Sequence, residues 1–404
     1  MDLYSGLPFW IIKNALYDYN KPLQENLKID VAIIGSGITG SLVAHELCEA
    51  GIKCAIFDKR TVATGSTAAS TAQLQYEIDV PLSQMIKDVG EKKAVQAYQS
   101  SLQSITDLEN VLQQLKVKAD FKRVSTVFLA SNRNGRRMIG EEYETRSKYG
   151  LPVSYLDEEQ LMKTYGIDGF GALYNDQSAQ MDAYAAATGI LNYHYSKKEL
   201  DIYSPVEIVR YEEKKGGYDL KTKDGFVISC KYVIIAAGFE AGQFLPKEVM
   251  HLNSTYALVT NPIEEEQFWK EKSLIWETKS PYFYMRSTAD NRIMMGGEDE
   301  PFRNPKVRDL LLRKKVRKLS YKLKKMFPEI KFEVSMAWCG TFSSTKDGLP
   351  FIGAWPGKKR MLYALGYGGN GITFSMIAAQ IIRNTLEGKK DDRSDTFGFE
   401  RLSE

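Results

Sequence analysis

Residues 30–40, DVAIIGSGITG, decide the fold that we predict for this chain. An apolar run leads directly into three glycines, Gly35, Gly37 and Gly40, spaced as G-x-G-x-x-G. This pattern is typical of a buried parallel strand that turns sharply into a helix. The first glycine permits the turn, the second lets the backbone approach a pyrophosphate, and the third lets helix and strand touch. The stretch therefore predicts a dinucleotide cradle with the phosphates at a helix N-terminus.

The following residues complete a strand, helix, strand unit. Apolar residues keep helical spacing from Ile38 to Ala50, Gly51 ends the helix, and residues 53–57 form a second apolar strand. Asp58 closes that strand, where an acid accepts hydrogen bonds from the adenosine ribose hydroxyls. The complete unit is the context that a G-x-G-x-x-G match requires, although it does not choose between NAD and FAD.

The bulk composition excludes several classes of protein. The 404 residues are 43% hydrophobic and 26% charged, and the net charge of +3 is too small to indicate a nucleic-acid partner. The basic run at 313–318 is interpreted as a solvated helix face, because apolar residues recur between the charges. The four cysteines form no C-x-x-C pair. No signal-like or membrane-spanning apolar run is found, so we expect a cytoplasmic protein without a membrane span.

The order of predicted elements indicates an α/β protein, α+β overall, with a discontinuous Rossmann-like domain and an inserted, mainly antiparallel sheet domain. Residues 83–115 have a helical pattern, residues 121–130 a strand pattern, and residues 174–181 are expected to form a loop. Short strand-like pieces separated by turns fill the region 250–335. The nucleotide-binding domain is predicted to comprise 1–117, 151–245 and 336–404, and the inserted substrate domain 118–150 and 246–335.

Five further stretches carry a family resemblance. They are GSTAAS (65–70), YSPVEIV (203–209), VIIAAGFEA (233–241), TKDGLPFIG (345–353) and ALGYGGNGITFSMIAAQII (364–382). Small residues in the first can present N–H and hydroxyl groups without obstruction, and the last is a glycine loop that leads into a helix. Together with the cradle, they resemble the D-amino-acid oxidase superfamily, near its glycine oxidase and sarcosine oxidase branches.

The resemblance implies that FAD is the cofactor and that it is bound without a covalent link. In this family the closing helix faces the flavin pyrimidine, where backbone N–H groups and the helix dipole stabilise negative charge. The implied cofactor-binding residues are Gly35, Gly37, Ile38, Thr39, Gly40, Asp58, Lys59, Ser66, Thr67, Val206, Gly238, Gly340, Gly369, Asn370, Gly371 and Ile372.

The family also implies a reaction. Hydride leaves a carbon that bears a neutral amine of a small-molecule substrate, the resulting imine is hydrolysed, and oxygen or another electron acceptor reoxidises the flavin. The sarcosine oxidase branch attaches FAD to a cysteine at the position of Gly340, so Cys339 is one residue out of register. That branch also activates oxygen with a lysine, and this chain has Met294 at the corresponding position. A dehydrogenase therefore stays an alternative to an oxidase.

The chain departs from the family at the substrate clamp. Phe342 occupies the place of the arginine that holds the substrate carboxylate, and an apolar ring cannot replace it. Strand alternation puts Tyr282, Tyr284 and Arg286 on one face, so Arg286 is a candidate replacement cation. An aromatic core with a surface arginine is an equally weighted interpretation. The candidate pocket residues are Tyr282, Tyr284, Arg286 and Phe342.

Two alternative functions remain open at this level. An FAD-dependent 2-hydroxy-acid dehydrogenase would need a base for the hydroxyl proton, and no histidine lies in a matching motif. The other alternative is a protein that binds FAD without turnover. His45, His194 and His251 have no ligand-spaced partners, so no metal site is predicted. No pattern indicates an oligomeric state.

Overall fold

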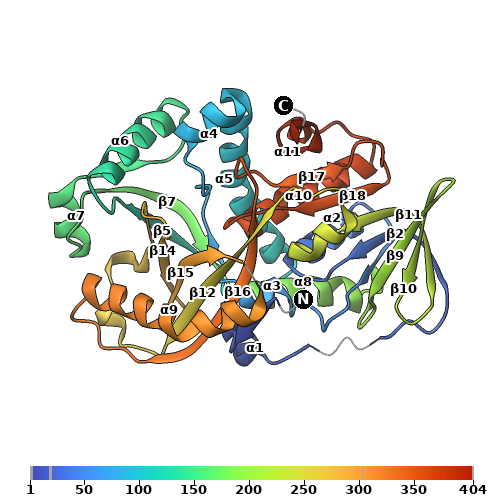
Figure 1. The fold of residues 1–404 in the computed structure, drawn as a ribbon, viewed down its shortest axis with the longest axis horizontal. Coiled ribbons are helices and arrows are strands. Elements are labelled where there is room, and N and C mark those ends of the chain that lie inside the picture. The colour runs from blue at the N-terminus through green and yellow to red at the C-terminus, as the bar shows by residue number, and fades with distance from the viewer. Residues whose placement is uncertain (1–2, 18–20, 303, 403–404) are drawn as a thin grey trace.

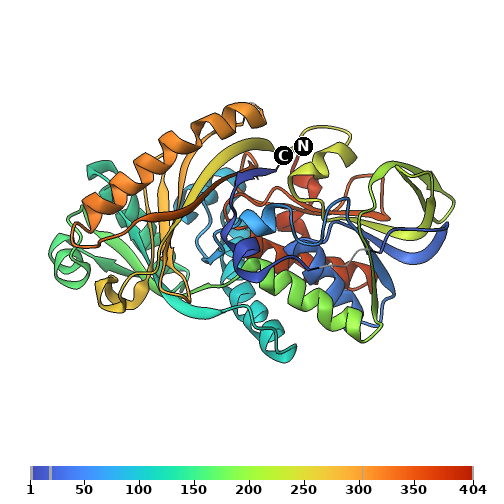
Figure 2. The same cartoon turned by 90° about the horizontal axis from the view of Figure 1, so that it is seen from below.

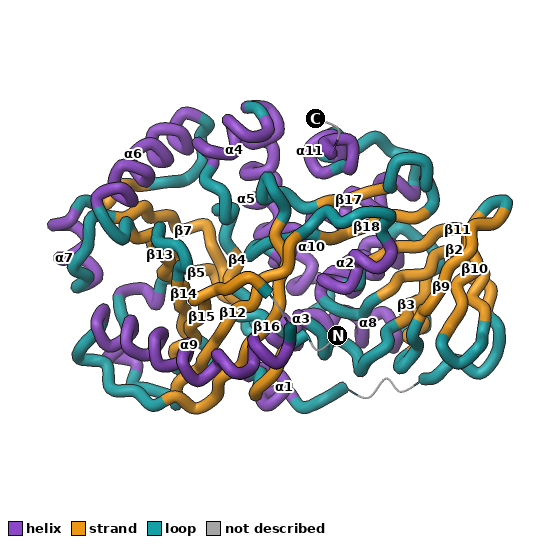
Figure 3. Tube along the Cα trace, viewed as in Figure 1, coloured by secondary structure: helices purple, strands orange, loops and turns teal. Residues whose placement is uncertain are grey.

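The structure, a computed structural model, describes residues 3–17, 21–302 and 304–402. It contains two large sheets that lie side by side, one on each side of Figure 1. Figure 3 shows the same two groups of strands in orange. The arrangement confirms the predicted mixed α/β fold with a parallel nucleotide-binding sheet and a mainly antiparallel second sheet.

The nucleotide-binding sheet has eight strands, with β9 and β10 attached beside β11. Its strands are β2 (Leu27–Ile34), β3 (Cys54–Phe57), β8 (Leu200–Tyr203), β9 (Ile208–Lys214), β10 (Gly217–Thr222), β11 (Val227–Ile235), β17 (Phe351–Ala354) and β18 (Met361–Leu365). The strands β18, β11, β2, β3 and β8 are parallel neighbours. Because parallel strands end at one edge, the residues that follow β2, β3 and β11 meet there.

Three helices pack on one face of this sheet. They are α2 (Ile38–Glu49), α8 (Ala183–Ser196) and α10 (Gly371–Leu386), and a fourth helix, α5 (Glu91–Gln114), packs on α10. Their apolar side chains join those of β2 and β3 in the main core. A second core on the opposite face contains side chains of the β9–β10 hairpin and of η1 (Gly238–Phe244). Burial on both faces explains the continuous apolar runs of the central strands.

The second sheet has ten strands. They are β1 (Tyr4–Gly6), β4 (Gln73–Leu74), β5 (Lys122–Leu129), β6 (Ser154–Leu156), β7 (Ala172–Gln180), β12 (His251–Thr260), β13 (Leu274–Glu277), β14 (Phe283–Ser287), β15 (Ile293–Pro301) and β16 (Val334–Ser344). Only β5 and β13 pair in parallel among these described strands. The long helix α9 (Pro305–Met326) covers the outer face of this sheet, as its orange ribbon shows in Figure 2.

The remaining helices are short connections or peripheral elements. They are α1 (Phe9–Asn14), α3 (Ser66–Ala69), α4 (Leu82–Val89), α6 (Arg133–Lys148), α7 (Glu158–Tyr165), α11 (Ser394–Phe397), η2 (Glu265–Gln267), η3 (Lys270–Lys272) and η4 (Phe399–Leu402). Within the described ranges, no helix is long and apolar enough to cross a membrane.

Three expectations differ from the structure. Residues 174–180 lie in strand β7, not in a loop. The strand pattern was hidden in the sequence because Asn175 and Ser178 are buried polar residues that bond to neighbouring side chains. The second sheet therefore extends to Gln180 rather than ending at 150, and it also includes β16. In the basic run, Lys315 is buried and donates to the carbonyl of Glu298, so that face is not wholly solvated.

Candidate functional site

The glycines of the cradle have the geometry that the motif predicts. Gly35 has a φ of +107°, and a Cβ there would lie 2.5 Å from the carbonyl oxygen of Ala236. A Cβ at Gly40 would lie 2.0 Å from the carbonyl oxygen of Gly35, so helix α2 touches the turn directly. Helix α2 begins at Ile38, and the N–H groups of its first turn have no acceptor within the helix.

Asp58 organises the turn from the end of β3. Its Oδ2 accepts hydrogen bonds from the N–H and the hydroxyl of Ser36 at 2.8 and 2.6 Å, and its Oδ1 accepts from the N–H of Arg60. The N–H of Val206 donates to the carbonyl of Asp58 at 2.7 Å. This contact fixes the backbone of Val206, one of the implied cofactor-binding residues, beside the end of β3.

One cavity extends from the cradle to the space between the two sheets. Gly40 does not line it, since it supports the turn from behind. Every other predicted cofactor-binding residue does: Gly35, Gly37, Ile38, Thr39, Asp58, Lys59, Ser66, Thr67, Val206, Gly238, Gly340, Gly369, Asn370, Gly371 and Ile372. The topology therefore brings together residues that are separated by more than three hundred positions in the sequence.

The small-residue segment after β3 forms the short helix α3 rather than an open loop. The Thr67 hydroxyl accepts the N–H of Ile38 at 2.9 Å, which fixes the segment against α2. The buried Ser66 hydroxyl lines the cavity without a hydrogen-bond partner in the described chain. Such a group is normally satisfied, so this wall fits a bound phosphate-bearing cofactor.

An ion-pair group lies at the nucleotide end of the cavity. Lys59 and Arg60 contact Glu240 of η1 at 2.8 and 2.6 Å. Burial would raise the pKa of Glu240, but hydrogen bonds from Arg60 and Lys59 outweigh burial and lower that pKa to about 2. The ammonium of Lys59 is therefore engaged with Glu240, which ties the loop after β3 to the loop after β11.

The closing helix α10 presents its N-terminus to the cavity, as predicted, with one difference. The N–H of Gly369 donates to Asp79 Oδ2 at 2.7 Å, so it already has an anionic acceptor. Gly371 and Ile372 lie in the first turn of α10, whose N–H groups have no acceptor within the helix. Of the predicted residues of this loop, Gly371 and Ile372 therefore keep first-turn N–H groups without an acceptor in the helix, whereas Gly369 does not face the cavity with a free N–H.

Three of the four predicted pocket residues line the far end of the cavity. Tyr282 and Tyr284, near and on β14, and Phe342 on β16 all do so. Burial raises the pKa of Tyr284 to about 12, so its phenol stays protonated. The indole of Trp276 also lines this end, and sequence reasoning missed it.

Arg286 is not a wall of the cavity, and the expectation that it holds a substrate carboxylate is not supported. Its Nη1 donates to the carbonyls of Thr71, Ala72 and Met181 at 2.7 to 2.9 Å. Alternation places Arg286 on the predicted face, but its guanidinium fastens β14 to the other domain. Burial lowers the pKa of Arg286 to about 9.

Three carboxylates line the same end of the cavity and were not predicted. They are Glu77, Asp79 and Asp299. The two on the segment after GSTAAS could have been found, because that segment alternates polar and apolar residues as an extended wall does. Asp299 lies at the far end of β15, and no local pattern marks it.

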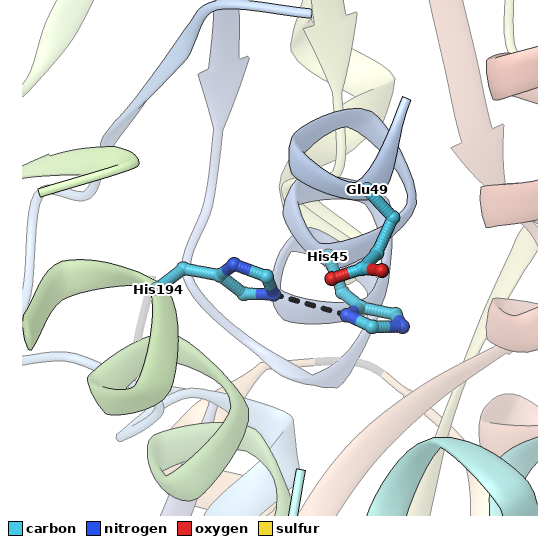
Figure 4. A group of neighbouring side chains, drawn as sticks. All are labelled: His45, Glu49 and His194. Carbon is cyan, nitrogen blue, oxygen red and sulfur yellow. Dashed lines mark hydrogen bonds between the residues drawn. The ribbon is translucent and has the colours of Figure 1, made fainter. Parts of the chain in front are cut away.

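The structure brings His45 and His194 together, although the sequence showed no ligand spacing. His45 Nδ1 lies 3.0 Å from His194 Nε2, and His194 Nδ1 lies 2.7 Å from Glu199. Figure 4 shows the two imidazoles facing each other, with Glu49 beside them. Both nitrogens of His194 thus have protein partners, so hydrogen bonding between α2 and α8 accounts for the pair.

Cys339 points away from the cavity. Its side chain packs in the core between the second sheet and α9, and its Sγ lies 3.4 Å from Asp309. Burial raises the pKa of this thiol to about 11. Its neighbour Gly340 lines the cavity instead.

The fold and the cavity define a dinucleotide-binding protein in which a cavity runs from the cradle on one sheet to the side of a second sheet. A family model described as FAD dependent oxidoreductase matches residues 30–385. The chain therefore belongs to this family of flavoenzymes, the resemblance to the D-amino-acid oxidase superfamily is confirmed, and FAD is the cofactor.

Relatives with curated names match nearly the whole chain. The chain is 23% identical to "Probable oxidoreductase OrdL" of Haemophilus influenzae, over 93% of this chain and 86% of that protein. It is also 23% identical to gamma-glutamylputrescine oxidoreductase of Escherichia coli, over 93% and 87% of the two chains. The crystal structure of glycine oxidase from Geobacillus kaustophilus superimposes with a TM-score of 0.76 at 20% identity, covering 91% of this chain and 96% of that one.

Proposed function

We propose that this protein oxidises an amine that lacks the usual clamped carboxylate, by transfer of hydride from the carbon next to nitrogen. The observation that carries the proposal is the composition of the far end of the cavity. Aromatic rings and carboxylates form its walls, Phe342 stands where the family has its clamp, and Arg286 is bonded to backbone carbonyls.

The residues of the chain contribute binding and orientation. Bound FAD supplies the acceptor for the hydride. Tyr282, Tyr284 and Phe342 form the aromatic part of the chamber wall, and positioning of the reacting carbon against such a wall accounts for much of the rate enhancement in hydride transfer. None of the three histidines lines the cavity, which disfavours a 2-hydroxy-acid substrate that needs a base.

We further propose that FAD is held without a covalent link. The support is the direction of Cys339, which lies in the core under α9 and holds its proton. Acid precipitation of the purified holoprotein tests this proposal. The yellow flavin should stay in the supernatant, and flavin retained in the washed pellet would contradict it.

Anaerobic reduction tests the proposed reaction. The holoprotein is mixed without oxygen with amines, amino acids and 2-hydroxy acids of matched length, and bleaching near 450 nm is followed as for any flavin. Amines should bleach the flavin, and readmission of air then compares oxygen with an added acceptor dye. Bleaching by hydroxy acids alone would favour the dehydrogenase alternative, and bleaching by none would favour a protein that binds FAD without turnover.

A further inference from the structure

One wall of the cavity carries a row of polar groups without partners. Residues 73–79 run along it, and alternation turns Gln73, Gln75, Glu77 and Asp79 toward the cavity. Within the described chain, no hydrogen bond satisfies Gln73 Nε2 and Oε1, Gln75 Nε2 or Glu77 Oε2, all of them buried. Unpaired buried polar groups cost free energy, so this wall is built to meet a polar ligand.

Glu77 is the most deeply buried carboxylate of the wall, with 3% of its surface exposed. Its Oε1 accepts from Asn175 Nδ2 at 2.5 Å and from Arg146 Nη1 at 3.4 Å. Arg146 is shared, because its Nε also donates to Glu142 at 2.7 Å. Two carboxylates therefore face one guanidinium, and Glu77 Oε2 has no hydrogen-bond partner in the described chain.

Asp79 and Asp299 add two more carboxylates. The carboxylate of Asp79 packs against Gly368 and Gly369, since a Cβ at Gly369 would lie 2.7 Å from its Oδ1. Asp299 reaches the cavity from β15, and its buried Oδ1 has no hydrogen-bond partner in the described chain. Burial, and then the charge of Asp79, raise the pKa of Asp299 to about 7.

Among the described lining residues, the cations are Lys59 and Arg60, and both contact Glu240 at the nucleotide end. Arg146, behind the wall, contacts Glu77, whereas Asp79 and Asp299 have no ion pair within the described chain. Like charges gathered in one chamber repel one another unless a cation enters. The chamber is therefore complementary to a positively charged ligand.

We propose that the substrate carries a second, cationic nitrogen, as a diamine or polyamine does, and that Asp79, Asp299 and Glu77 bind this nitrogen. This inference rests on the proposed function and names its substrate class. The distal ammonium stays protonated between the carboxylates, while the amine that is oxidised is neutral and faces the cofactor. The carboxylates thus take the positioning role that an arginine clamp has for amino acids.

The reaction balances with water and an electron acceptor as the co-reactants. The C–H bond next to the neutral amine breaks, its two electrons leave with the hydride to FAD, and an iminium ion remains. Water adds to the iminium carbon, the C–N bond breaks, and ammonium and an aminoaldehyde are released. Oxygen or another acceptor then removes two electrons from the reduced cofactor.

Three compounds of equal chain length provide the first test. They are 1,4-diaminobutane, butylamine and 4-aminobutanoate, and the concentration for half-maximal rate of anaerobic bleaching is measured for each. The half-maximal concentration should be at least ~10-fold lower for the diamine than for butylamine, which corresponds to ~1.4 kcal/mol. The half-maximal concentration should be highest for 4-aminobutanoate. Equal or better use of 4-aminobutanoate would overturn the inference.

Variants assign the effect to the carboxylates. Asp299→Asn and Asp79→Asn should each weaken the response to the diamine ~10-fold more than the response to butylamine. Asp224→Asn, in the exposed turn between β10 and β11, removes the same charge and should change neither. Glu77→Gln is a poorer probe, because Glu77 also binds Arg146. Equal losses for both amines would show that Asp79 and Asp299 do not bind the second nitrogen.

Binding without turnover separates the two proposals. The bis-quaternary ion tetramethylene-bis(trimethylammonium) has no nitrogen lone pair and cannot be oxidised, yet it should shift the flavin spectrum in the wild type. The Asp299→Asn variant should require ~10-fold more of this ion. If no amine bleaches the flavin but the ion still binds through Asp299, the proposed reaction is wrong. If amines bleach it and the ion has no effect, the cation site is wrong.

The affinity for the bis-quaternary ion should also change with pH, in one defined direction. Asp299 binds a cation only when ionised, so binding of the bis-quaternary ion should tighten as pH rises through about 7. The groups that face Asp299 are the Thr255 hydroxyl, Asp79, Lys315, Glu298 and the phenols of Tyr282 and Tyr284. The Asp299→Asn variant should lose this pH-dependent change in affinity. If the change persists in the variant, the titrating group is another of those named.

Discussion

The residue type of Arg286 suggested a role in binding a substrate carboxylate that its contacts do not support. Strand alternation predicted its face correctly, but alternation does not reveal depth. The guanidinium lies 5.4 Å from the ring centroid of Trp10 and donates to carbonyls of two separate segments. A buried charge with such partners is a fastening between domains, and it holds the segment that leads into the polar cavity wall.

Replacing Arg286 with Met should therefore destabilise the protein. Three buried carbonyls would lose their donor, and we expect the free energy of unfolding to fall by about 3 kcal/mol. Urea unfolding at pH 7 provides the measurement, with Arg210→Met on the exposed strand β9 as control. Unchanged stability together with a higher KM for amino acids would return Arg286 to the substrate site.

Gly40 offers a sharper test of the cradle. An alanine there would bring its Cβ to 2.0 Å from the Gly35 carbonyl oxygen, so α2 would have to move away from β2. We expect Gly40→Ala to purify with little flavin. Gly140→Ala, on α6 with open space around it, should keep its flavin, and a glycine replaced within a helix adds stability of ~0.5–1 kcal/mol. Full flavin content in Gly40→Ala would contradict the assigned contact.

At the scale of elements, α2 and α8 are joined by the pair His45 and His194. Burial, and then the neighbouring His194, lower the pKa of His45 to about 4. Hydrogen bonds to Cys48 and Glu199 outweigh burial and raise the pKa of His194. The unfolded chain therefore binds more protons at His45 between pH 6.5 and 4, and stability due to His45 is lost as pH falls through that window. For His194 the sign is opposite, since its stabilisation is lost as pH rises.

His45→Gln should separate the two effects. Glutamine retains a hydrogen-bonding group for His194 but does not titrate, so the variant should lose less stability than the wild type between pH 7 and 4.5. Urea midpoints at the two pH values measure this difference. His251→Gln, on an exposed position of β12, serves as the control. The same acid sensitivity in His45→Gln and wild type would exclude His45 as its source.

Local signals explain which parts of the fold and site could be predicted. The cradle was readable because turn, phosphate contact and helix start lie within eleven residues of 30–40. The closing stretch 364–382 was recognised for the same reason. Strand β7 was missed, because its buried polar residues depend on partners such as Glu77 that are distant in sequence. The acidic chamber escaped prediction since Asp79 and Asp299 meet only through the tertiary fold.

At the scale of the whole molecule, the N-terminal arm joins the two sheets. Strand β1 pairs with β16 of the second sheet, and α1 then packs against α3 and α8 beside the cradle. Trp10 is 1% exposed, and its indole N–H donates to the carbonyl of Ser70 at 2.6 Å. The arm thus contributes a strand to one sheet and a helix beside the other.

Trp10→Ala should weaken both stability and cofactor retention. Removal of a buried indole costs about 3–5 kcal/mol, and the Ser70 carbonyl at the end of α3 would lose its donor. Thermal unfolding followed by flavin fluorescence measures both effects, because released flavin fluoresces more strongly. Tyr17→Ala, on an exposed part of the arm, should change the midpoint by a smaller amount. Equal midpoints for the two variants would contradict the role given to Trp10.

The pairing of β1 with β16 has a consequence for how the chain is made. Residues 4–6 leave the ribosome long before their partner strand, which ends at Ser344. Strand β1 therefore stays unpaired until more than three hundred further residues have been made. Domains complete themselves as their last segment emerges, so the second sheet closes only late in synthesis. Chains released early by premature termination should accordingly be substrates for chaperones and proteases.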